Sequence, residues 1–213
     1  MELLQAYGLP TRLGGYRPRF NITPSEIQWT ILRAAGNLEA RGLRWGLVPS
    51  WSSDPSIGSR MINARADSVA EKPSFRDALR NGRCLVITDG YYEWAKTGAG
   101  KTPYRFCMTN RKPFVFAGLW DRWLSGDSII ESCTIITTEA SAATAHLHHR
   151  MPVILDFDES MEWMRPNASP TQLLRLLRPY EKDELEMFEV SRAVNSPKND
   201  TEECIRPVRE ARS

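Results

Sequence analysis

The sequence predicts an α+β protein built around an antiparallel β-sheet. Many short apolar and β-branched runs are separated by turn residues, a pattern typical of strands. Between these runs lie a few segments with apolar residues at helical spacing. No repeat, low-complexity linker or clear domain boundary divides the 213 residues. We therefore expect a single domain over residues 1–208, followed by a short C-terminal tail over 209–213.

The individual elements follow from these patterns. The expected strands cover residues 27–32, 43–48, 84–88, 104–108, 114–120 and 132–138, and a Gly-rich turn over 97–103 marks a hairpin. The expected helices cover residues 75–80, 140–146, 159–164 and 170–177.

Composition excludes several classes of protein. The net charge of +2 and the pI of about 8.4 do not by themselves indicate a nucleic-acid binder. The four cysteines are widely spaced and form no CxxC pair, and we expect Cys84, Cys107 and Cys133 to be core residues in a reducing compartment. No apolar run approaches the length of a membrane span or resembles a signal peptide, so we expect no membrane partner. A cytoplasmic setting follows, associated with the nucleoid if the protein is bacterial.

One stretch ends a predicted strand with a carboxylate among aromatic residues. After the apolar run that begins at Cys84 come Gly90, two tyrosines, Glu93 and Trp94. The glycine indicates a bulge or a close backbone approach. A carboxyl group kept from water has its charged form disfavoured, so its pKa should rise toward the range useful for acid–base chemistry. An exposed turn at the end of an edge strand is the alternative.

Two further segments carry candidate functional side chains. Asn63 and Arg65 lie two residues apart, so on an extended segment they share a face and can hold a polar or anionic ligand. The alternative is a capped turn in which Arg65 pairs with Asp67. All three histidines fall within residues 146–149. Because no Cys, Asp or Glu completes a ligand set before Asp156, we expect no metal ion and no other cofactor.

A catalytic histidine is the simpler interpretation of this cluster. His148 and Arg150 share one face of an extended segment, where Arg150 can grip a phosphate. Solvent-exposed histidines in a loop are the alternative. Tryptophans are also frequent, with seven in the chain. We expect Trp51 to be exposed, whereas Trp120, Trp123 and Trp163 are typical of packed positions.

Taken together, these motifs resemble the SRAP family of SOS-response-associated, or abasic-site-processing, proteins. The matching segments occur in order along nearly the whole chain: Arg19–Pro24 (RFNITP), Trp45–Trp51 (WGLVPSW), Ile62–Asp67 (INARAD), Gly90–Trp94 (GYYEW), His148–Leu155 (HHRMPVIL), Val190–Asn195 (VSRAVN) and Ile205–Val208 (IRPV). The resemblance implies a single domain with a barrel-like antiparallel sheet, flanking helices and no cofactor. It also implies a monomer that binds single-stranded DNA containing abasic sites, with replication-fork proteins as further partners.

The resemblance also implies a covalent reaction. In the family, an N-terminal cysteine condenses with the ring-opened sugar through its amine and its thiol. The thiazolidine that forms crosslinks the protein to the lesion, a lyase-like chemistry. Asn63, Glu93 and His148 would then be catalytic, Glu93 as the acid–base group. His148 matches the family histidine because it stands four residues before Pro152. The implied DNA-binding residues are Asn21, Pro24, Trp51, Arg65, Arg150, Ser191 and Arg192.

The chain departs from the family at its start. The family begins Met-Cys-Gly-Arg, whereas this sequence begins Met1-Glu2-Leu3-Leu4. Either a front segment is missing or the nucleophile has been lost; we favour the first because Asn63, Glu93 and His148 are retained. Two other functions stay open. One is a noncovalent single-stranded DNA-binding protein, and the other is a peptidase that acts mainly on its own N-terminus.

Overall fold

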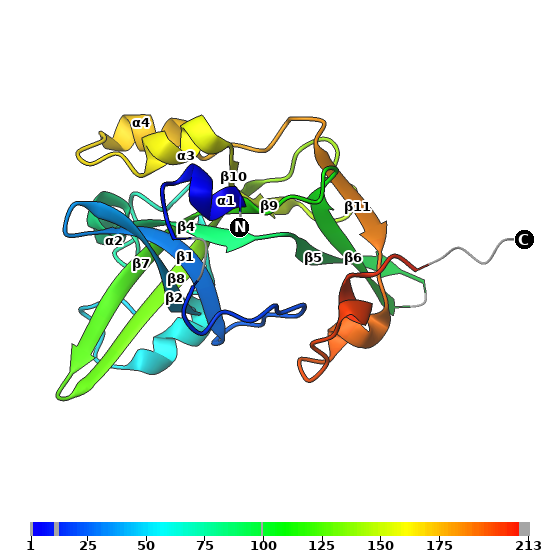
Figure 1. Ribbon diagram of the computed structural model, residues 1–213, viewed down its shortest axis with the longest axis horizontal. Coiled ribbons are helices and arrows are strands. Elements are labelled where there is room, and N and C mark those ends of the chain that lie inside the picture. Colours follow the sequence, from blue (N-terminus) through cyan, green and yellow to red (C-terminus); the bar gives the residue numbers. More distant parts are fainter. Residues whose placement is uncertain (1, 11–12, 99, 209–213) are drawn as a thin grey trace, which may run out of the picture.

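The main feature of the computed structural model is a closed β-barrel (Figure 1). Residues 2–10, 13–98 and 100–208 are described. Five strands form the ring in the order β7 (Phe114–Ser125), β4 (Arg83–Thr88), β1 (Ile27–Ala34), β2 (Asn37–Trp45) and β8 (Ser128–Glu139). The pairing of β8 with β7 closes it. Every pair in the ring is antiparallel except β2 with β8. The predicted α+β class with a barrel-like, mainly antiparallel core is confirmed.

Three short strands extend the barrel wall. β3 (Asn63–Arg65) runs parallel to β8, and β9 (Arg150–Pro152) runs antiparallel to the same strand. β10 (Ile154–Leu155) adds to the edge of β7. Strand β8 therefore carries two short neighbours at its C-terminal end, where both contain residues of the predicted site.

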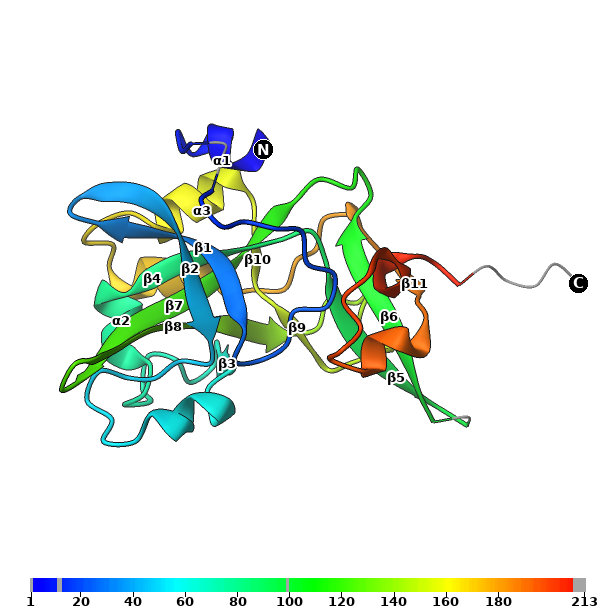
Figure 2. The same ribbon diagram turned by 60° about the horizontal axis from the view of Figure 1, so that its bottom comes forward.

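A second, three-stranded sheet stands beside the barrel (Figure 2). It consists of β5 (Tyr91–Thr97), β6 (Gly100–Met108) and β11 (Leu185–Glu189), and the predicted hairpin is the β5–β6 turn. A small cluster of Val190, Val194 and Cys204 packs the 3-10 turns η2 (Arg192–Asn195) and η3 (Glu202–Ile205) against this sheet. Only two residues, Asp89 and Gly90, separate β4 of the barrel from β5.

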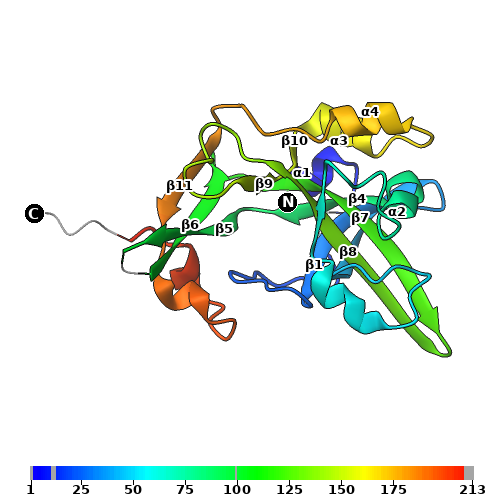
Figure 3. The ribbon, with the colours of Figure 1, turned by 180° about the vertical axis from the view of Figure 1, so that it is seen from behind.

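Helices cover the outside of the barrel. They are α1 (Glu2–Ala6), α2 (Arg76–Asn81), α3 (Phe157–Trp163) and α4 (Pro170–Arg175), and a 3-10 turn, η1 (Pro55–Arg60), precedes β3. Helices α3 and α4 lie along the top of Figures 1 and 3, and α2 lies lower, at one end of the barrel. Asp156 and Ser169 form capping boxes that begin α3 and α4. Trp163 is fully buried, and its indole N–H donates to the Cys84 carbonyl at 3.1 Å, which fixes α3 on the barrel.

The helix predicted over residues 140–146 is wrong. Residues 142–147 form turns instead. The Ser141 carbonyl accepts hydrogen bonds from the Thr144 and Ala145 amides and from the Thr144 hydroxyl. Such local side-chain bonds compete with a continuing helix. Two smaller corrections follow: β2 ends at Trp45 rather than Val48, and Trp120 is only partly buried.

Cys84, Cys107 and Cys133 are buried and free, as predicted, and Cys204 is buried as well. Burial raises the pKa of the Cys133 thiol to about 12, so it does not ionise at neutral pH. No helix in the described parts of the chain has the length and apolar character needed to span a bilayer. The boundary between a domain and a tail stays a prediction, because residues 209–213 lie outside the described residues.

Gly46 provides a test of the packing that leads into β3. Its φ is +125°, and a Cβ there would lie 2.6 Å from the Gly58 carbonyl oxygen. We expect Gly46→Ala to lower the free energy of unfolding by about 2 to 4 kcal/mol, because it combines backbone strain with a steric clash. Urea denaturation measures this. Gly14→Ala is the control, since a Cβ at Gly14 meets nothing within 4 Å; equal effects of the two variants would contradict the account.

Candidate functional site

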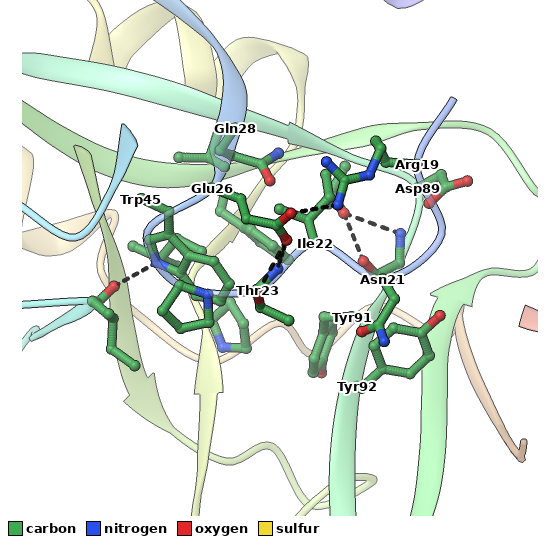
Figure 4. Close-up of a pocket in the computed structure, with 18 of the residues that line it drawn as sticks. Arg19, Asn21, Ile22, Thr23, Glu26, Gln28, Trp45, Asp89, Tyr91 and Tyr92 are labelled. Carbon is green, nitrogen blue, oxygen red and sulfur yellow. Dashed lines mark hydrogen bonds and ion pairs between the residues drawn. The ribbon is translucent and has the colours of Figure 1, made fainter. Parts of the chain in front are cut away.

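The predicted site residues gather along a cleft between the barrel and the second sheet. The cleft has a volume of about 1420 Å³. An N-terminal strap, residues 15–26, forms one of its walls, and the opening stretch of β5 forms another (Figure 4). Of the predicted residues, it is lined by Asn21, Pro24, Asn63, Arg65, Glu93, His148 and Arg150.

The strap is tied to the C-terminal segment by Asn21 and Asp200. The side-chain amide of Asn21 is buried and donates to the carbonyls of residues 194, 196 and 199 at 3.0 to 3.1 Å. Asp200 accepts from the Phe20 and Asn21 amides and pairs with Arg19. Asn21 therefore holds the cleft together through its side chain, and Pro24 lies exposed on the strap.

Glu93 enters the cleft from β5 and is largely shielded from water. Its side chain is 24% exposed, and burial raises the pKa of the carboxyl above its ordinary value of 4.5. The nearby His148 imidazole acts in the opposite direction. Two positions earlier on the strand, Tyr91 stacks on Phe106 with ring centroids 4.8 Å apart. The aromatic surroundings and the raised pKa expected for Glu93 are therefore present.

His148 lies opposite Glu93, with its Nδ1 atom 3.7 Å from Glu93 Oε1. The same nitrogen lies 2.9 Å from the carbonyl oxygen of Arg150, which can accept its proton. The Arg150 amide lies 3.3 Å from the same nitrogen and can donate to it, so the ring contacts the Arg150 backbone in either tautomer. A carboxyl of raised pKa beside an imidazole is an arrangement that can both donate and accept a proton near neutral pH.

Asn63 and Arg65 face the cleft from β3, as their spacing predicts. Both are exposed, whereas Ala64 between them is fully buried. The indole N–H of Trp45 donates to the Ile62 carbonyl at 2.8 Å and fixes the start of this strand. Arg65 does not pair with Asp67: within the described residues its guanidinium has no carboxylate within 4.0 Å.

Arg150 is held more firmly than the sequence indicates. Its Nε donates to the Thr137 hydroxyl at 3.2 Å, and one terminal nitrogen donates to the Thr137 carbonyl at 2.5 Å. The other terminal nitrogen lies 3.4 Å from Asp67. Only 17% of the side chain is exposed. Asp67, which is itself exposed, therefore occupies the outer side of this guanidinium.

Arginines outnumber carboxylates among the residues that line the cleft. Six arginines line it against three carboxylates: Arg17, Arg19, Arg65, Arg105, Arg111 and Arg150, with Glu26, Asp89 and Glu93. Four of these arginines have carboxylate partners: Arg19 pairs with Glu26 at 2.6 Å (Figure 4) and with Asp200, Arg105 with Asp89, Arg111 with Glu186 and Arg150 with Asp67. Arg17 and Arg65 have no carboxylate partner among the described residues. An anionic ligand fits this balance best.

Three predicted site residues lie outside the cleft wall. Trp51 is 57% exposed, as expected, on a loop held by a hydrogen bond from the Trp123 indole to Ser52. The Ser191 hydroxyl caps η2, and Arg192 is exposed beside it. Their proposed contacts with DNA stay predictions.

Further residues line the cleft, among them Trp94, which lies in the GYYEW segment, and Arg105, which sequence reasoning missed. Trp94 is 36% exposed, and its indole N–H donates to Asn195 Oδ1 at 2.7 Å. Arg105 lies on β6 without any motif around it, so only the β5–β6 pairing could have indicated it. No group of three or more His, Cys, Asp or Glu in the described parts of the chain is arranged to hold a metal ion.

The raised pKa of Glu93 predicts a pH-dependent effect on stability. The Glu93 carboxyl has a higher pKa in the folded state than in the unfolded state. Its ionisation therefore lowers the stability of the fold as the pH rises from the unfolded-state pKa through the folded-state pKa. We expect Glu93→Gln to stabilise the protein at pH 8 and to have little effect at pH 4, by chemical denaturation. The pKa of Asp67 is lowered, chiefly by Ser68, so Asp67→Asn should instead destabilise at pH 8. A change in the free energy of unfolding with the same sign for both variants at pH 8 would contradict this prediction.

Known proteins share this architecture and sequence. The family model described as SOS response associated peptidase (SRAP) matches residues 2–197. The abasic site processing protein YoaM of Bacillus subtilis is 42% identical over 195 residues, covering 90% of this chain and 86% of the relative. HMCES of Gallus gallus, also named an abasic site processing protein, is 36% identical over 231 residues. The match covers 92% of this chain and 68% of the relative. A crystal structure of a protein from Bacteroides thetaiotaomicron superposes with a TM-score of 0.79 at 31% sequence identity. The superposition covers 86% of this chain and 82% of that protein. The chain belongs to the SRAP family.

Proposed function

We propose that this protein binds single-stranded DNA at abasic sites and protects the lesion in the DNA damage response. The observation that carries the proposal is the Glu93–His148 pair at 3.7 Å in a cleft where arginines outnumber carboxylates. Arginines bind the phosphates, and the acid–base pair acts on the sugar. The names of the relatives, abasic site processing proteins, support the same lesion.

A single strand suits this cleft better than a duplex. Its wall includes the half-exposed ring of Trp94, held in place by Asn195, and Tyr16, which is 57% exposed. Unpaired bases stack on such rings at little cost, whereas paired bases are not available to them. The missing base at an abasic site leaves the sugar free to reach Glu93.

The covalent step belongs to a protein that carries an N-terminal cysteine. Its α-amine attacks the sugar aldehyde, the aldehyde oxygen leaves as water, and the thiol adds to the resulting iminium carbon to close a thiazolidine. Glu93 protonates the departing oxygen and His148 takes the thiol proton, while Asn63 orients the sugar. The four cysteines of this sequence are buried within the chain and lack a free amine, so none supplies this nucleophile.

Two measurements on the same oligonucleotides test the proposal. Fluorescence anisotropy measures binding of a single strand with one abasic site, an intact single strand and a duplex. Intact mass spectrometry detects a protein–DNA adduct. We expect preferential binding of the abasic strand, and loss of that preference would overturn the proposal. Binding without any adduct, even when an N-terminal cysteine is present, would favour the noncovalent alternative. The geometry gives no support to a peptidase, since no serine or cysteine in the described residues hydrogen bonds to His148.

Arg65 should contribute a phosphate contact. We expect Arg65→Ala to weaken binding of single-stranded DNA and to reduce the slope of log affinity against log salt by about 0.7, the value for one phosphate contact. The slope is measured by anisotropy between low and moderate salt. Arg175→Ala, an exposed arginine on α4 outside the cleft, is the matched control. An unchanged slope for Arg65→Ala would exclude this contact.

Glu93 should serve the chemistry rather than the binding. In a form of the protein that begins with cysteine, we expect Glu93→Gln to slow adduct formation by about 10²- to 10⁴-fold, the range for loss of a general acid–base group. Affinity for the abasic strand should change little. Adduct is followed on denaturing gels at saturating protein. An equal loss of both properties would show that Glu93 holds the ligand instead.

A further inference from the structure

Arg105 is a buried cation that the proposed chemistry does not use. It lies on β6 and pairs in register with Tyr92 of β5. Its side chain is only 7% exposed, although it lines the cleft. Burying a guanidinium is unfavourable unless its hydrogen bonds are satisfied. Its carboxylate partner, Asp89, is 64% exposed and so offsets only part of that cost.

The contacts of Arg105 converge on the link between the barrel and the second sheet. One terminal nitrogen donates to the Asp89 carbonyl at 3.1 Å and lies 3.2 Å from the Asp89 carboxylate. The guanidinium also lies against Gly90, where a Cβ would come within 2.9 Å of Nε and 2.6 Å of the Phe106 carbonyl. From the other side, the Thr88 hydroxyl donates to the Gly90 carbonyl at 2.6 Å. The two-residue link is therefore held from both sides.

The direction of this link sets where Glu93 lies relative to His148. The two residues come from different sheets, Glu93 from β5 and His148 from the segment before β9. Three residues of extended chain from Gly90 to Glu93 span about 10 Å, so a tilt of about 5° at the link moves the carboxyl by about 1 Å. A displacement of about 1 Å in a catalytic group can reduce a rate by about 100-fold.

We propose that Arg105 is a positioning residue, which holds the Asp89–Gly90 link so that the Glu93 carboxyl stays beside His148. This inference rests on the proposed function for the role of Glu93. Arg105 points to the same side of the sheet as Tyr92, its register partner, and Glu93 points to the other. It therefore acts on Glu93 through the backbone, rather than by touching the lesion.

The test measures the coupling between Glu93 and His148 in the DNA-free protein. The Glu93 carboxyl is titrated by carbon-13 NMR, with its resonance assigned by its absence in Glu93→Gln. In the wild-type background we expect His148→Ala to raise the Glu93 pKa, because the favourable charge is lost. In Arg105→Met, which keeps the buried volume, His148→Ala should shift the pKa by less than about half as much. Arg105→Lys, which can still donate to both Asp89 oxygens, should restore most of the coupling.

Three outcomes would overturn the proposal. Unchanged coupling in Arg105→Met, accompanied only by a lower melting temperature, would make Arg105 merely structural. A fall in the salt slope of single-strand binding, with coupling intact, would make it a direct phosphate contact. The same loss of coupling in Arg122→Met, an exposed arginine on β7, would show that the effect is not specific. Because the titration needs no DNA, failure of the inference is distinguishable from failure of abasic-site binding.

Discussion

Strand β8 holds the site together because its C-terminal end has a different partner on each edge. On one edge it pairs in parallel with β3, setting Arg65 opposite Thr137. On the other it pairs antiparallel with β9, setting Arg150 opposite Glu139. The backbone hydrogen bonds on both edges fix where Asn63 and His148 emerge, although 85 residues separate them in sequence. The pairing of β7 with β8 closes the barrel over residues 128–135, just before this end of the strand.

Glu93 reaches the site by a different route, from the second sheet. Its position depends on the short Asp89–Gly90 link and on the strap that Asn21 and Asp200 tie to the C-terminal segment. Two separately built walls thus meet at one pair of side chains. The pKa of Glu93 is set where they meet: burial by one wall raises it, and His148 on the other limits the rise.

Local patterns in the sequence were sufficient for most strands, and they singled out Glu93 and His148 as candidates; the catalytic roles of the two residues rest on the family resemblance and stay predictions. The alternation at Asn63 and Arg65 and the apolar run that leads to Glu93 depend on residues that are close in sequence. Tertiary contacts do not override the extended conformation that these patterns predict. The helix predicted over 140–146 was wrong, because the Thr144 hydroxyl bonds the Ser141 carbonyl and the Ser141 hydroxyl contacts that of Thr144. The place of Arg105, the hydrogen bond from Trp94 to Asn195 and the restraint of Arg150 by Thr137 could not be predicted, because they depend on contacts between distant segments.

The positive charge of the cleft comes entirely from guanidinium groups. None of the described residues that line it is a lysine. Arginine and lysine bind phosphate alike, but only the lysine amine, once deprotonated, adds readily to an aldehyde to form an imine. An aldehyde held here is therefore surrounded by cations that attract its phosphates without attacking its carbonyl. For the proposed abasic-site substrate, such a cleft would keep the reactive sugar intact until a chosen amine reaches it.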